Sequence, residues 1–385
     1  MTDSIRVAMV IHNYYPTIGG AERVLTALSP ELKKNNIDIH ILTRRLPGTA
    51  AFERISGIPV YRLSATGPKQ FASLSFTLSA LRRIRKLRPD IVHSHIMFSP
   101  ATIGLIARWL FRTGFVITVH RSGPAPLGET ERLKQLFLGK FRLSLFRKYA
   151  EKFIAVSREI DTELAAAGIP ESRRILIPNA VDADYFYPLS PDDKRALRER
   201  LGIHSDRIAV YTGRLRPEKQ VHLLISAWQK IQKSYPDALL LIVGEGPLYE
   251  KLKNQVREGI IFTGGVSSVL PYLQAADIFV LPSAAEGLSI AMLEAMSSAL
   301  PAIVTDIAGA KDVITHKKNG WLVRPGDVEE LQQGLIALFG DEALRNKIGK
   351  EAREHIRQNY SLNAVEKQLR NLYLRIVQEK SDITN

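Results

Sequence analysis

The chain has 385 residues, of which 45% are hydrophobic and 24% are charged, so it is typical of a globular protein with enough apolar material for two domains. It contains no cysteine, which excludes disulfides, cysteine-ligated zinc and thiol catalysis. The formal net charge of +14 lies mostly in residues 1–185, where 27 Lys and Arg face 15 Asp and Glu, and a basic half indicates an acidic partner such as nucleic acid, anionic lipid or an anionic substrate.

The first residues are predicted to lead into a buried strand. Asp3 precedes a short apolar run at 6–12, without the basic start and longer apolar core of a signal peptide. No stretch approaches the roughly 18 uncharged residues that a membrane span needs. We therefore expect a cytoplasmic protein, either free or peripheral on the inner face of a membrane.

Short apolar runs alternate with amphipathic helical stretches along most of the chain, which predicts parallel βαβ units. In the first half the predicted strands are 6–12, 38–43, 59–63, 90–95, 115–120, 152–157 and 174–178. In the second half they are 207–213, 238–244, 260–264, 277–282, 302–305 and 320–323.

A segment rich in Pro, Asp and Tyr at 177–194 interrupts this alternation, and a helix is predicted over 361–378. The expected fold class is α/β, with two Rossmann-like doubly wound domains that face each other across a cleft. We place an N-terminal domain at 1–183 and a C-terminal domain at 184–360. The closing helix, within 361–385, is expected to pack back on the N-terminal domain.

Most of the unusual residues lie at the end of a predicted strand or after it, where doubly wound sheets bind their ligands. They are Gly19, Gly20, His93, His95, His120, Arg214, Glu245 and Glu286. Because so many share one structural position, the pattern predicts a binding site.

Arg214 and Lys219 occupy a turn before a predicted helix, where two cations suit a phosphate or a diphosphate. A solvated basic turn is the equally simple alternative. Gly19 and Gly20 would let backbone amides approach a phosphate, although the full dinucleotide fingerprint is absent and a flexible turn is the alternative. Glu245 lies in a turn that either caps the next helix or lines the cleft.

The histidines admit two interpretations. His120 is either a hydrogen-bonded core residue or, beside Arg121, a group that holds a substrate hydroxyl or carbonyl. His93 and His95 alternate on one strand and therefore face the same way. We do not favour a metal there, because no cysteine or nearby carboxylate completes the ligand set. The D-x-D at 182–184 resembles a metal motif, but its place between domains favours a turn.

Glu286 and Glu294 are eight positions apart in an otherwise small and apolar stretch. They could be the acid and the nucleophile of a hydrolase. Alternatively, they could accept hydrogen bonds from hydroxyl groups of a sugar and a ribose. The second interpretation fits better beside Arg214 and Lys219, since a diphosphate leaving group needs charge stabilisation more than a general acid.

The chain resembles the retaining glycosyltransferases of family four, which have the GT-B fold. The resemblance rests on "YYPTIGGAERV", "DIVHSH", "IAVSREI", "YTGRLRPEKQ", "LIVGEGP" and "DIFVLPSAAEGLSIAMLEAM", and it runs nearly from end to end. It implies that Glu286 holds the hydroxyls of the donor sugar and that Glu294 holds the ribose.

The resemblance also implies roles for residues around these two. Arg214 and Lys219 would bind the diphosphate, and Gly20 would approach it from the other domain. The segment Gly287, Leu288, Ser289 and Ile290 would line the phosphates and sugar with its backbone. His120 would lie beside the sugar. His93, His95 and Arg121 would lie on the acceptor side. This chain departs from the family pattern at Arg121 and at Ser289, where glycine is common.

The expected function is retaining transfer of a hexose-type sugar from a UDP- or GDP-sugar to a hydroxyl of a lipid-linked, envelope or polysaccharide acceptor. Neither a metal nor another cofactor is expected. In this resemblance the N-terminal domain binds the acceptor and the C-terminal domain binds the nucleotide sugar. The alternatives are an epimerase, a phosphorylase that would need pyridoxal phosphate, and a nucleotide-sugar-binding protein without turnover.

Two basic stretches, 81–88 and 132–149, account for part of the N-terminal charge, and the second contains Phe137, Phe141 and Phe146. They could dock on an anionic membrane. Alternatively, they form solvated helix faces whose phenylalanines turn into the core. Nucleic acid is not expected as a partner, because no recognition motif or stacking platform is evident.

Overall fold

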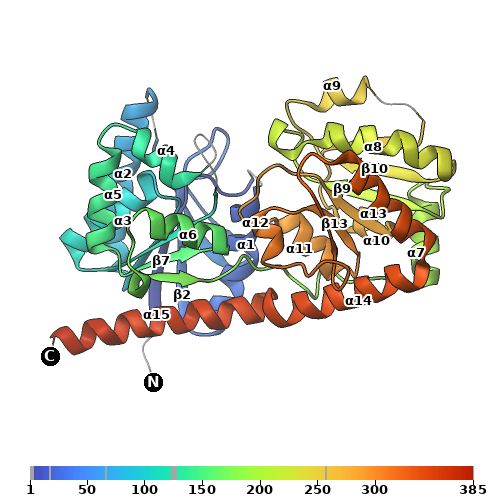
Figure 1. Ribbon diagram of the computed structural model, residues 1–385. Coiled ribbons are helices and arrows are strands. Elements are labelled where there is room, and N and C mark those ends of the chain that lie inside the picture. The colour runs from blue at the N-terminus through green and yellow to red at the C-terminus, as the bar shows by residue number, and fades with distance from the viewer. Residues whose placement is uncertain (1–3, 17–18, 66, 123–127, 256–257, 385) are drawn as a thin grey trace. The chain divides into compact units, whose positions relative to one another are not determined.

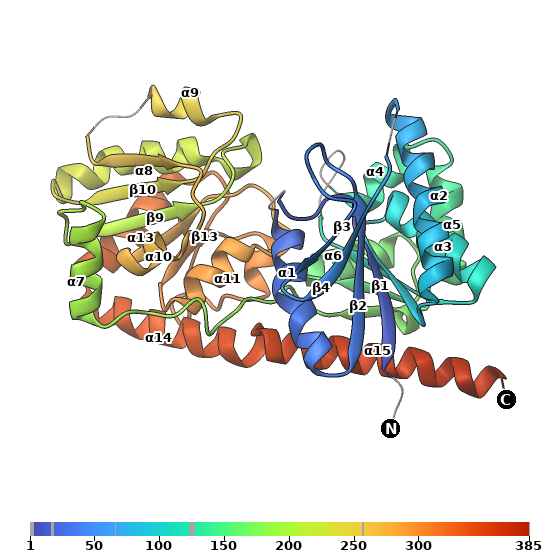
Figure 2. The ribbon, with the colours of Figure 1, turned by 180° about the vertical axis from the view of Figure 1, so that it is seen from behind.

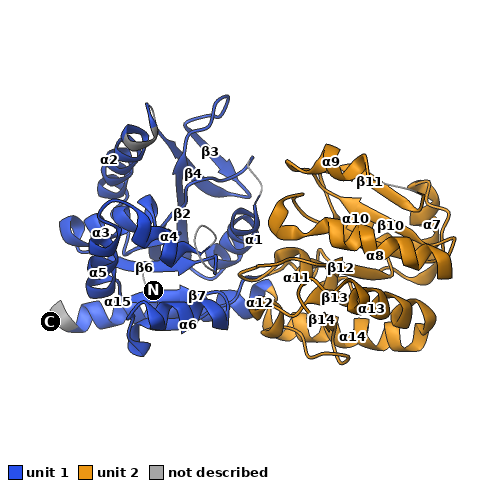
Figure 3. Ribbon diagram, turned by 45° about the horizontal axis from the view of Figure 1, so that its top comes forward, with its two compact units in different colours: residues 1–180, 362–385 blue, residues 181–361 orange. Residues whose placement is uncertain are grey.

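The computed structural model describes residues 4–16, 19–65, 67–122, 128–255 and 258–384. The chain forms two compact units, residues 1–180 with 362–385 (unit 1) and residues 181–361 (unit 2) (Figure 3). The sequence had suggested divisions after residues 183 and 360. Each unit contains its own sheet, so each can be described as a separate α/β layer structure.

The sheet of unit 1 has the strand order β3-β4-β2-β1-β5-β6-β7-β8. Its strands are β1 (Ile5–Val10), β2 (Ile37–Arg44), β3 (Phe52–Ile55), β4 (Ile58–Leu63), β5 (Ile91–His95), β6 (Gly114–Val119), β7 (Lys152–Ala155) and β8 (Arg174–Leu176). All neighbours are parallel except β3, which runs antiparallel to β4 at the edge. The central strands β5 and β6 are buried throughout, as expected of a sheet covered on both faces.

Helices cover both faces of this sheet (Figures 1 and 2). They are α1 (Gly20–Lys34), α2 (Lys69–Leu87), α3 (Ser99–Phe111), α4 (Glu129–Gln135), α5 (Gly139–Tyr149), α6 (Arg158–Ala166) and α15 (Leu362–Thr384), with a 3₁₀ turn at Glu171–Arg173. Although α15 ends the chain, it packs against α1 and contacts β1 and β6. Its Tyr373 is hydrogen-bonded to His93 on β5, with 2.6 Å between the hydroxyl and Nδ1.

Unit 2 has a six-stranded parallel sheet in the order β11-β10-β9-β12-β13-β14. The strands are β9 (Ile208–Thr212), β10 (Leu239–Val243), β11 (Ile260–Gly264), β12 (Ile278–Leu281), β13 (Ala302–Thr305) and β14 (Trp321–Val323). The helices are α7 (Pro191–Arg200), α8 (Val221–Ser234), α9 (Tyr249–Lys253), α10 (Leu270–Ala275), α11 (Ile290–Ser297), α12 (Ala308–Lys311), α13 (Val328–Gly340) and α14 (Glu342–Asn359).

Both sheets reverse their direction of strand addition once. In unit 1 the reversal lies between β1 and β5, and in unit 2 it lies between β9 and β12. The connections that follow the two strands of such a pair run over opposite faces of the sheet. They therefore leave a crevice beyond the carboxyl ends of these strands. Topology alone therefore marks one position in each unit for a ligand.

Every predicted strand is present, and the structure adds β3, which is a short edge strand whose residues are half-buried or exposed. The closing helix extends to Thr384, beyond the predicted end at 378. The D-x-D motif forms a turn, as expected, since Oδ1 of Asp182 accepts the backbone N–H groups of Asp184 and Tyr185 at 3.2 and 3.0 Å.

Candidate functional site

Unit 2 places its most unusual ion pair beyond the carboxyl ends of β9 and β12. Lys219 ends a 3₁₀ turn at Pro217–Lys219, and its Nζ contacts Oε1 of Glu286 in the loop after β12. The same carboxylate oxygen accepts a hydrogen bond of 2.8 Å from the hydroxyl of Ser283. The side chains of Lys219 and Glu286 are only 20% and 16% exposed, so the pair is largely buried but still reaches the surface.

A backbone contact joins the two loops that carry this pair. The N–H of Ala284 donates to the carbonyl of Glu218 at 2.8 Å. The sequence assigned Lys219 to a diphosphate and Glu286 to a sugar. The structure brings both residues into one contact, and it does so across the β9–β12 junction where the topology predicts a ligand.

Arg214 lies in the loop that leads from β9 to this turn, and it is exposed. Its carbonyl accepts a 3.1 Å hydrogen bond from the hydroxyl of Tyr211. Burial, followed by the nearby charges of Glu286 and Glu218, raises the pKa of Tyr211, so the phenol stays protonated and donates. Tyr211 thus fixes the loop at Arg214 while it lies within electrostatic range of Glu286.

Glycines allow the loops after β9 and β10 to approach each other. A Cβ on Gly244 would lie 2.0 Å from the carbonyl oxygen of Gly213. Next to it, the N–H of Leu215 donates to the carbonyl of Glu245 at 2.8 Å. This contact brings the backbone of Glu245 beside the Arg214 loop, whereas the Glu245 side chain is exposed and lies close to Gly265.

The start of α11 forms another wall of the same site. Ser289 caps the helix, and its Oγ accepts the N–H of Met292 at 3.4 Å. Leu288 is buried before it, and Ile290 begins the helix. The backbone of Gly287 packs closely against Gly309 of α12, since a Cβ on Gly309 would lie 2.2 Å from the carbonyl oxygen of Gly287.

A cavity of about 10 Å³ lies at this wall. Its polar lining comes from Ser283, Glu286, Ser289 and Thr305. Glu294 lies further along α11. Its side chain is largely covered by the protein, since the residue is 3% exposed.

Unit 1 places three histidines in a stack at the carboxyl ends of β5 and β6, with His93 and His95 on β5 and His120 directly after β6. The rings of His93 and His95 are 4.3 Å apart, and those of His95 and His120 are 5.4 Å apart. Nδ1 of His95 is 3.1 Å from Nε2 of His120. The predicted common orientation of His93 and His95 is confirmed.

These imidazoles are neutral at ordinary pH. Burial lowers the pKa of His93 to about 3 and that of His120 to about 4, with smaller effects from neighbouring charges, and it lowers the pKa of His95 well below its usual value. Both ring nitrogens of His93 are hydrogen-bonded, to Tyr373 and to Thr118 at 2.6 Å each. In the part of the chain that the structure describes, no group of three or more His, Cys, Asp or Glu side chains is arranged to hold a metal ion.

A cavity of about 40 Å³ lies against the stack, lined by all three histidines and by Met9, Asn179 and Leu369 among others. This volume is large enough for an ordered water molecule. Nε2 of His95 is buried without a hydrogen-bond partner among the described residues. The middle ring of the stack, His95, can therefore form one further hydrogen bond, while Tyr373 and Thr118 fix His93 at one end.

Glu129 is a residue of this region that the sequence analysis missed. Its two carboxylate oxygens accept the backbone N–H groups of Met97 at 2.9 Å and His120 at 2.8 Å. Burial raises its pKa to about 7, against the opposing effect of these hydrogen bonds. Glu129 thereby fixes the loops after β5 and β6 relative to each other and holds His120 in place.

The remaining predicted residues of unit 1, which are Gly19, Gly20 and Arg121, are not part of the histidine stack. Gly19 caps α1 and Gly20 begins it, and the carboxylate of Glu22 lies so close that a Cβ on Gly19 would be 2.3 Å from its Oε2. Arg121 is exposed. A carboxylate of the chain itself therefore lies against the helix terminus where the sequence suggested a phosphate.

His12 and Arg44 were also missed, although the signal used for the other residues applies to them. His12 follows β1 and Arg44 ends β2, so both are polar residues at strand ends. Their side chains meet, with 3.5 Å between Nη2 of Arg44 and Nε2 of His12.

Within the described residues, no helix is long and apolar enough to cross a membrane. Of the three phenylalanines in the basic stretch 132–149, Phe146 is fully buried, whereas Phe137 and Phe141 are 89% and 59% exposed. The alternative of core packing thus holds for Phe146 and fails for Phe137 and Phe141.

Comparisons with known proteins agree with these features. Residues 193–355 match the family model described as glycosyl transferases group 1, and residues 18–185 match the model described as glycosyltransferase family 4. Together the two models span most of both units.

Two relatives match over nearly their whole length. The chain is 26% identical to the N-acetyl-alpha-D-glucosaminyl L-malate synthase of Bacillus anthracis, over 95% of this chain and 96% of that protein. It is also 26% identical to the UDP-Gal:alpha-D-GlcNAc-diphosphoundecaprenol alpha-1,3-galactosyltransferase of Escherichia coli, over 95% of this chain and 96% of that protein.

Among solved structures, HepE of Anabaena in complex with UDP superposes with a TM-score of 0.81 at 19% identity, covering 96% of this chain and 99% of that chain. The same protein in complex with UDP-glucose gives a TM-score of 0.80 at 20% identity, covering 98% and 100%. At this level of identity the likeness establishes a shared fold.

Proposed function

The chain belongs to the group 1 and family 4 glycosyltransferases and has their GT-B fold, and from this premise we propose that it moves a hexose-type sugar from a UDP- or GDP-sugar to an acceptor hydroxyl with retention of anomeric configuration. The acceptor we propose is lipid-linked, or part of an envelope or polysaccharide structure. The galactosyltransferase of Escherichia coli, whose name includes a diphosphoundecaprenol acceptor, supports this class, as the UDP and UDP-glucose complexes of HepE support the donor.

The observation that carries the proposal is the contact of Lys219 with Glu286 at the β9–β12 reversal. A nucleotide diphosphate sugar presents an anion and several hydroxyls within a few ångströms of each other. Lys219 and Arg214 would stabilise the negative charge that grows on the departing diphosphate, and Glu286 would accept hydrogen bonds from the sugar.

The arrangement at Glu286 suits such a donor. Because Lys219 and Ser283 both reach Oε1 of Glu286, a sugar hydroxyl can replace either contact without leaving the carboxylate unpaired. The capped start of α11 adds backbone N–H groups beside it. Leu288, Ser289 and Ile290 are the residues we propose for the phosphate and sugar contacts, and we assign the ribose to Glu294.

We propose that the transfer needs no metal, since the cationic side chains and the helix terminus take over charge stabilisation. Full activity in excess EDTA is the expected result, and loss of activity that Mg²⁺ or Mn²⁺ restores would refute this part. Unit 1 is proposed to bind the acceptor, with neutral His120 close to the transferred sugar and His93, His95 and Arg121 on the acceptor side.

We also propose that unit 1 associates with the anionic inner face of a membrane. On α2, Phe71, Leu74 and Leu78 are 66%, 57% and 48% exposed, at spacings that place them on one helix face. Phe137 and Leu138, between α4 and α5, and Phe141, on α5, are also exposed. Helices α2, α3 and α5 lie side by side (Figures 1 and 2).

Basic side chains flank these apolar groups. Arg82, Arg85 and Lys86 are exposed near the end of α2, and Lys140, Arg147 and Lys148 are exposed on α5. Exposed aromatic residues between cations are typical of surfaces that bind anionic lipid. For a lipid-linked acceptor, such a surface would keep the enzyme where its substrate is.

Vesicle co-sedimentation tests this surface. Phosphatidylglycerol vesicles should retain the chain at low salt and release it at high salt, and Phe137→Ser with Phe141→Ser should abolish retention. The matched control replaces two other exposed apolar residues, Ile336→Ser with Leu374→Ser, and should behave as the parent. Retention that is indifferent to anionic lipid and to salt would remove the proposal.

A thermal-shift screen against UDP-, GDP- and ADP-sugars tests the donor. A sugar nucleotide at 100 times its Kd should stabilise the fold by about 2.7 kcal/mol. The nucleotide sugar that binds is then labelled in its sugar and incubated with the protein and a membrane extract. The label should be transferred to an acceptor in the extract. Donor binding without transfer to any acceptor would instead support a binding protein or an epimerase.

A further inference from the structure

A second cationic cluster lies in unit 1, and the donor does not account for it. We propose that Arg44 and Arg132, placed around His12, form an oxyanion site, and that the acceptor presents a phosphate or carboxylate group there. The assignment to the acceptor rests on the proposed transfer reaction, whereas the oxyanion site stands on the geometry of unit 1 alone.

Arg44 and His12 are fixed against each other by the sheet. The backbone N–H of Arg44 donates to the carbonyl of His12 at 3.3 Å, and Thr43 donates its hydroxyl to the same carbonyl. The Arg44 guanidinium lies 5.4 Å from the ring centre of Phe76, and the His12 ring lies 6.4 Å from it. Since Phe76 is fully buried in the core, both polar side chains rest on a rigid support.

Arg132 reaches the same place from α4. Its guanidinium lies 5.3 Å from the ring centre of Phe98, the residue that precedes α3. Helix α4 lies at the end of unit 1 opposite α15 (Figure 1). Burial first, and then the charges of Arg44 and Arg132, lower the pKa of His12 to about 3, so the imidazole that Arg44 contacts at 3.5 Å is neutral. Phe98, over which Arg132 lies, comes just after β5, and β5 is the neighbour of β1 in the sheet.

Arg44 and Arg132 differ from other arginines of the unit, which form ion pairs with carboxylates. Arg62 pairs with Glu53, and Arg174 pairs with Asp161. In the described ranges, Arg44 and Arg132 form no such ion pair, and Nε of Arg44 is buried without a hydrogen-bond partner. Arg44 is half-buried and Arg132 is exposed. Cations that gather without a carboxylate repel each other, and the half-buried one also loses solvation, which is typical of a site that binds an anion.

The carboxylates close by are engaged elsewhere. Glu129 accepts the backbone N–H groups of Met97 and His120, and Glu131 pairs with Lys134 on the surface of α4. Arg121, which is exposed and acts electrostatically on Glu129, adds a third cation at these strand ends. The local charge is therefore positive, and arginine guanidinium groups match phosphate and carboxylate oxygens in geometry.

The position agrees with the topology. His12 follows β1, and Phe98 lies just beyond β5, so the cluster borders the β1–β5 reversal, where a doubly wound sheet binds its ligand. Lys219 and Arg214 already supply the cations for a donor diphosphate in unit 2. An oxyanion in unit 1 therefore belongs to the other substrate.

Titration calorimetry of the full chain with inorganic pyrophosphate, and separately with L-malate, tests the site. Arg44→Gln with Arg132→Gln should weaken binding of at least one probe by about tenfold to a hundredfold, the range expected for lost charged hydrogen bonds. Arg132→Gln alone, at an exposed position, should weaken it in the same direction without risk to the fold. The probe whose binding the Arg44 and Arg132 variants weaken identifies the acceptor group as phosphate or carboxylate.

The matched control is Lys33→Gln with Arg54→Gln, which removes two charges of the same unit that both donate to the carbonyl of Gly57. It should bind both probes as the parent does. Equal weakening by this control, no weakening by the Arg44 and Arg132 variants, or no binding of either probe would overturn the proposal. Lys219→Ala separates the two claims: it should weaken pyrophosphate binding at the donor site but leave the Arg44 site intact, and unchanged nucleotide-sugar binding in that variant would count against the proposed function instead.

Discussion

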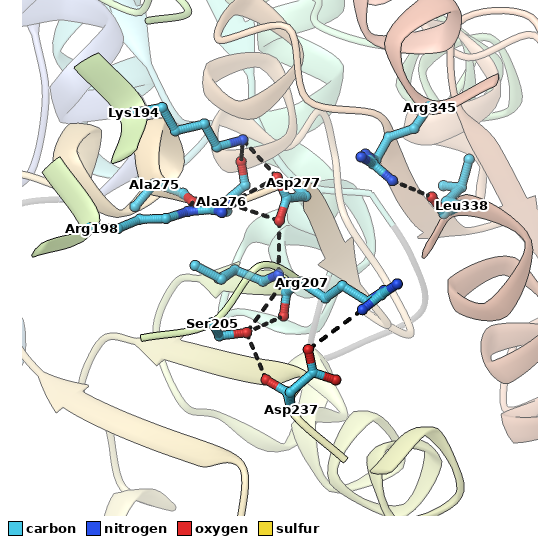
Figure 4. A network of polar contacts seen from close by, with 11 residues as sticks. Lys194, Arg198, Ser205, Arg207, Asp237, Ala275, Ala276, Asp277, Leu338 and Arg345 are labelled. Atoms are coloured by element: carbon cyan, nitrogen blue, oxygen red, sulfur yellow. Dashed lines mark hydrogen bonds and ion pairs between the residues drawn. The ribbon is translucent and has the colours of Figure 1, made fainter. Parts of the chain in front are cut away.

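Unit 2 carries charged side chains at both ends of one sheet, and the two clusters are built differently. At the amino ends of the strands, Asp277 accepts hydrogen bonds from Lys194 at 2.7 Å, from Arg198 at 2.8 Å and from the N–H of Ile208 at 2.8 Å (Figure 4). At the carboxyl ends, Glu286 receives Lys219 and Ser283 on a single oxygen.

The cations of the first cluster are anchored a second time. Lys194 and Arg198 of α7 also donate to the carbonyls of Ala276 and Ala275, at 2.6 and 2.8 Å. Such a network fixes a helix to the sheet, and its groups are already saturated by one another. The Glu286 cluster comes from two loops and lines a small cavity, so its contacts can be exchanged for those of a ligand. We therefore propose that the Asp277 network is structural, because backbone groups saturate it at the amino ends of the strands, and that the Lys219–Glu286 pair binds a ligand.

The largest effect should follow from removing the cations at the carboxyl ends. Arg214→Ala with Lys219→Ala should lower the rate of sugar transfer by roughly 10²–10³, as for lost oxyanion donors, with little change in melting temperature. Initial rates with a labelled donor measure this. Lys230→Ala, an exposed lysine on α8 of the same unit, is the control, and a double variant as fast as this control would contradict the assignment.

The opposite result is expected at the amino ends. Asp277→Asn leaves Lys194 and Arg198 half-buried without a carboxylate, which should cost about 3 kcal/mol of unfolding free energy. Denaturant unfolding measures the loss, and calorimetry should show unchanged affinity for the donor. Reduced donor affinity in a folded Asp277→Asn protein would break the distinction between the two clusters.

The neutral histidines of unit 1 predict a third effect, on acid stability. The pKa values of His12, His93 and His120 are near 3 or 4 in the folded chain, against 6.5 in a model peptide. The stability that they contribute is complete above pH 6.5 and is lost as the pH falls towards 4, at about 1.4 kcal/mol per pH unit for each histidine. Melting temperatures between pH 7 and 5 should fall, and they should fall less steeply in His93→Gln. A melting temperature independent of pH in this range would show that these imidazoles are solvated.

The smallest expected effect is on donor affinity, and it tests whether Ser283 orients the carboxylate of Glu286. Ser283→Ala removes one hydrogen bond of 2.8 Å to its Oε1 and should weaken donor binding by about 1 kcal/mol, or roughly fivefold. Calorimetry with the donor measures it, and Ser226→Ala on the exposed face of α8 serves as the control. Unchanged affinity would mean that Ser283 does not orient the carboxylate.

The sequence predicts the strands and the two-sheet architecture because buried parallel strands read as continuous apolar runs, and it points to strand ends as the place for a site. It could not predict that Lys219 contacts Glu286, since that contact depends on β9 lying next to β12. His12 and Arg44 were missed, although they end strands like the residues that were identified.

The orientation of the phenylalanines in 132–149 could not be predicted for a different reason. The stretch reads as one helix, but α4 ends at Gln135, and α5 begins at Gly139 after Leu138 takes a left-handed conformation with φ of 56°. A Cβ on Gly139 would lie 1.7 Å from the carbonyl oxygen of Leu133. This break places Phe137 at an exposed joint and leaves Phe146 in the core.

Hydrogen exchange of the full chain, with and without the nucleotide sugar selected by the thermal screen, tests the central claim most directly. The account predicts slower exchange in 213–220 and 283–292, the two loops joined by Lys219 and Glu286, and no change in 191–200 around the Asp277 network. Protection that leaves both loops unchanged would contradict a donor site at the β9–β12 reversal.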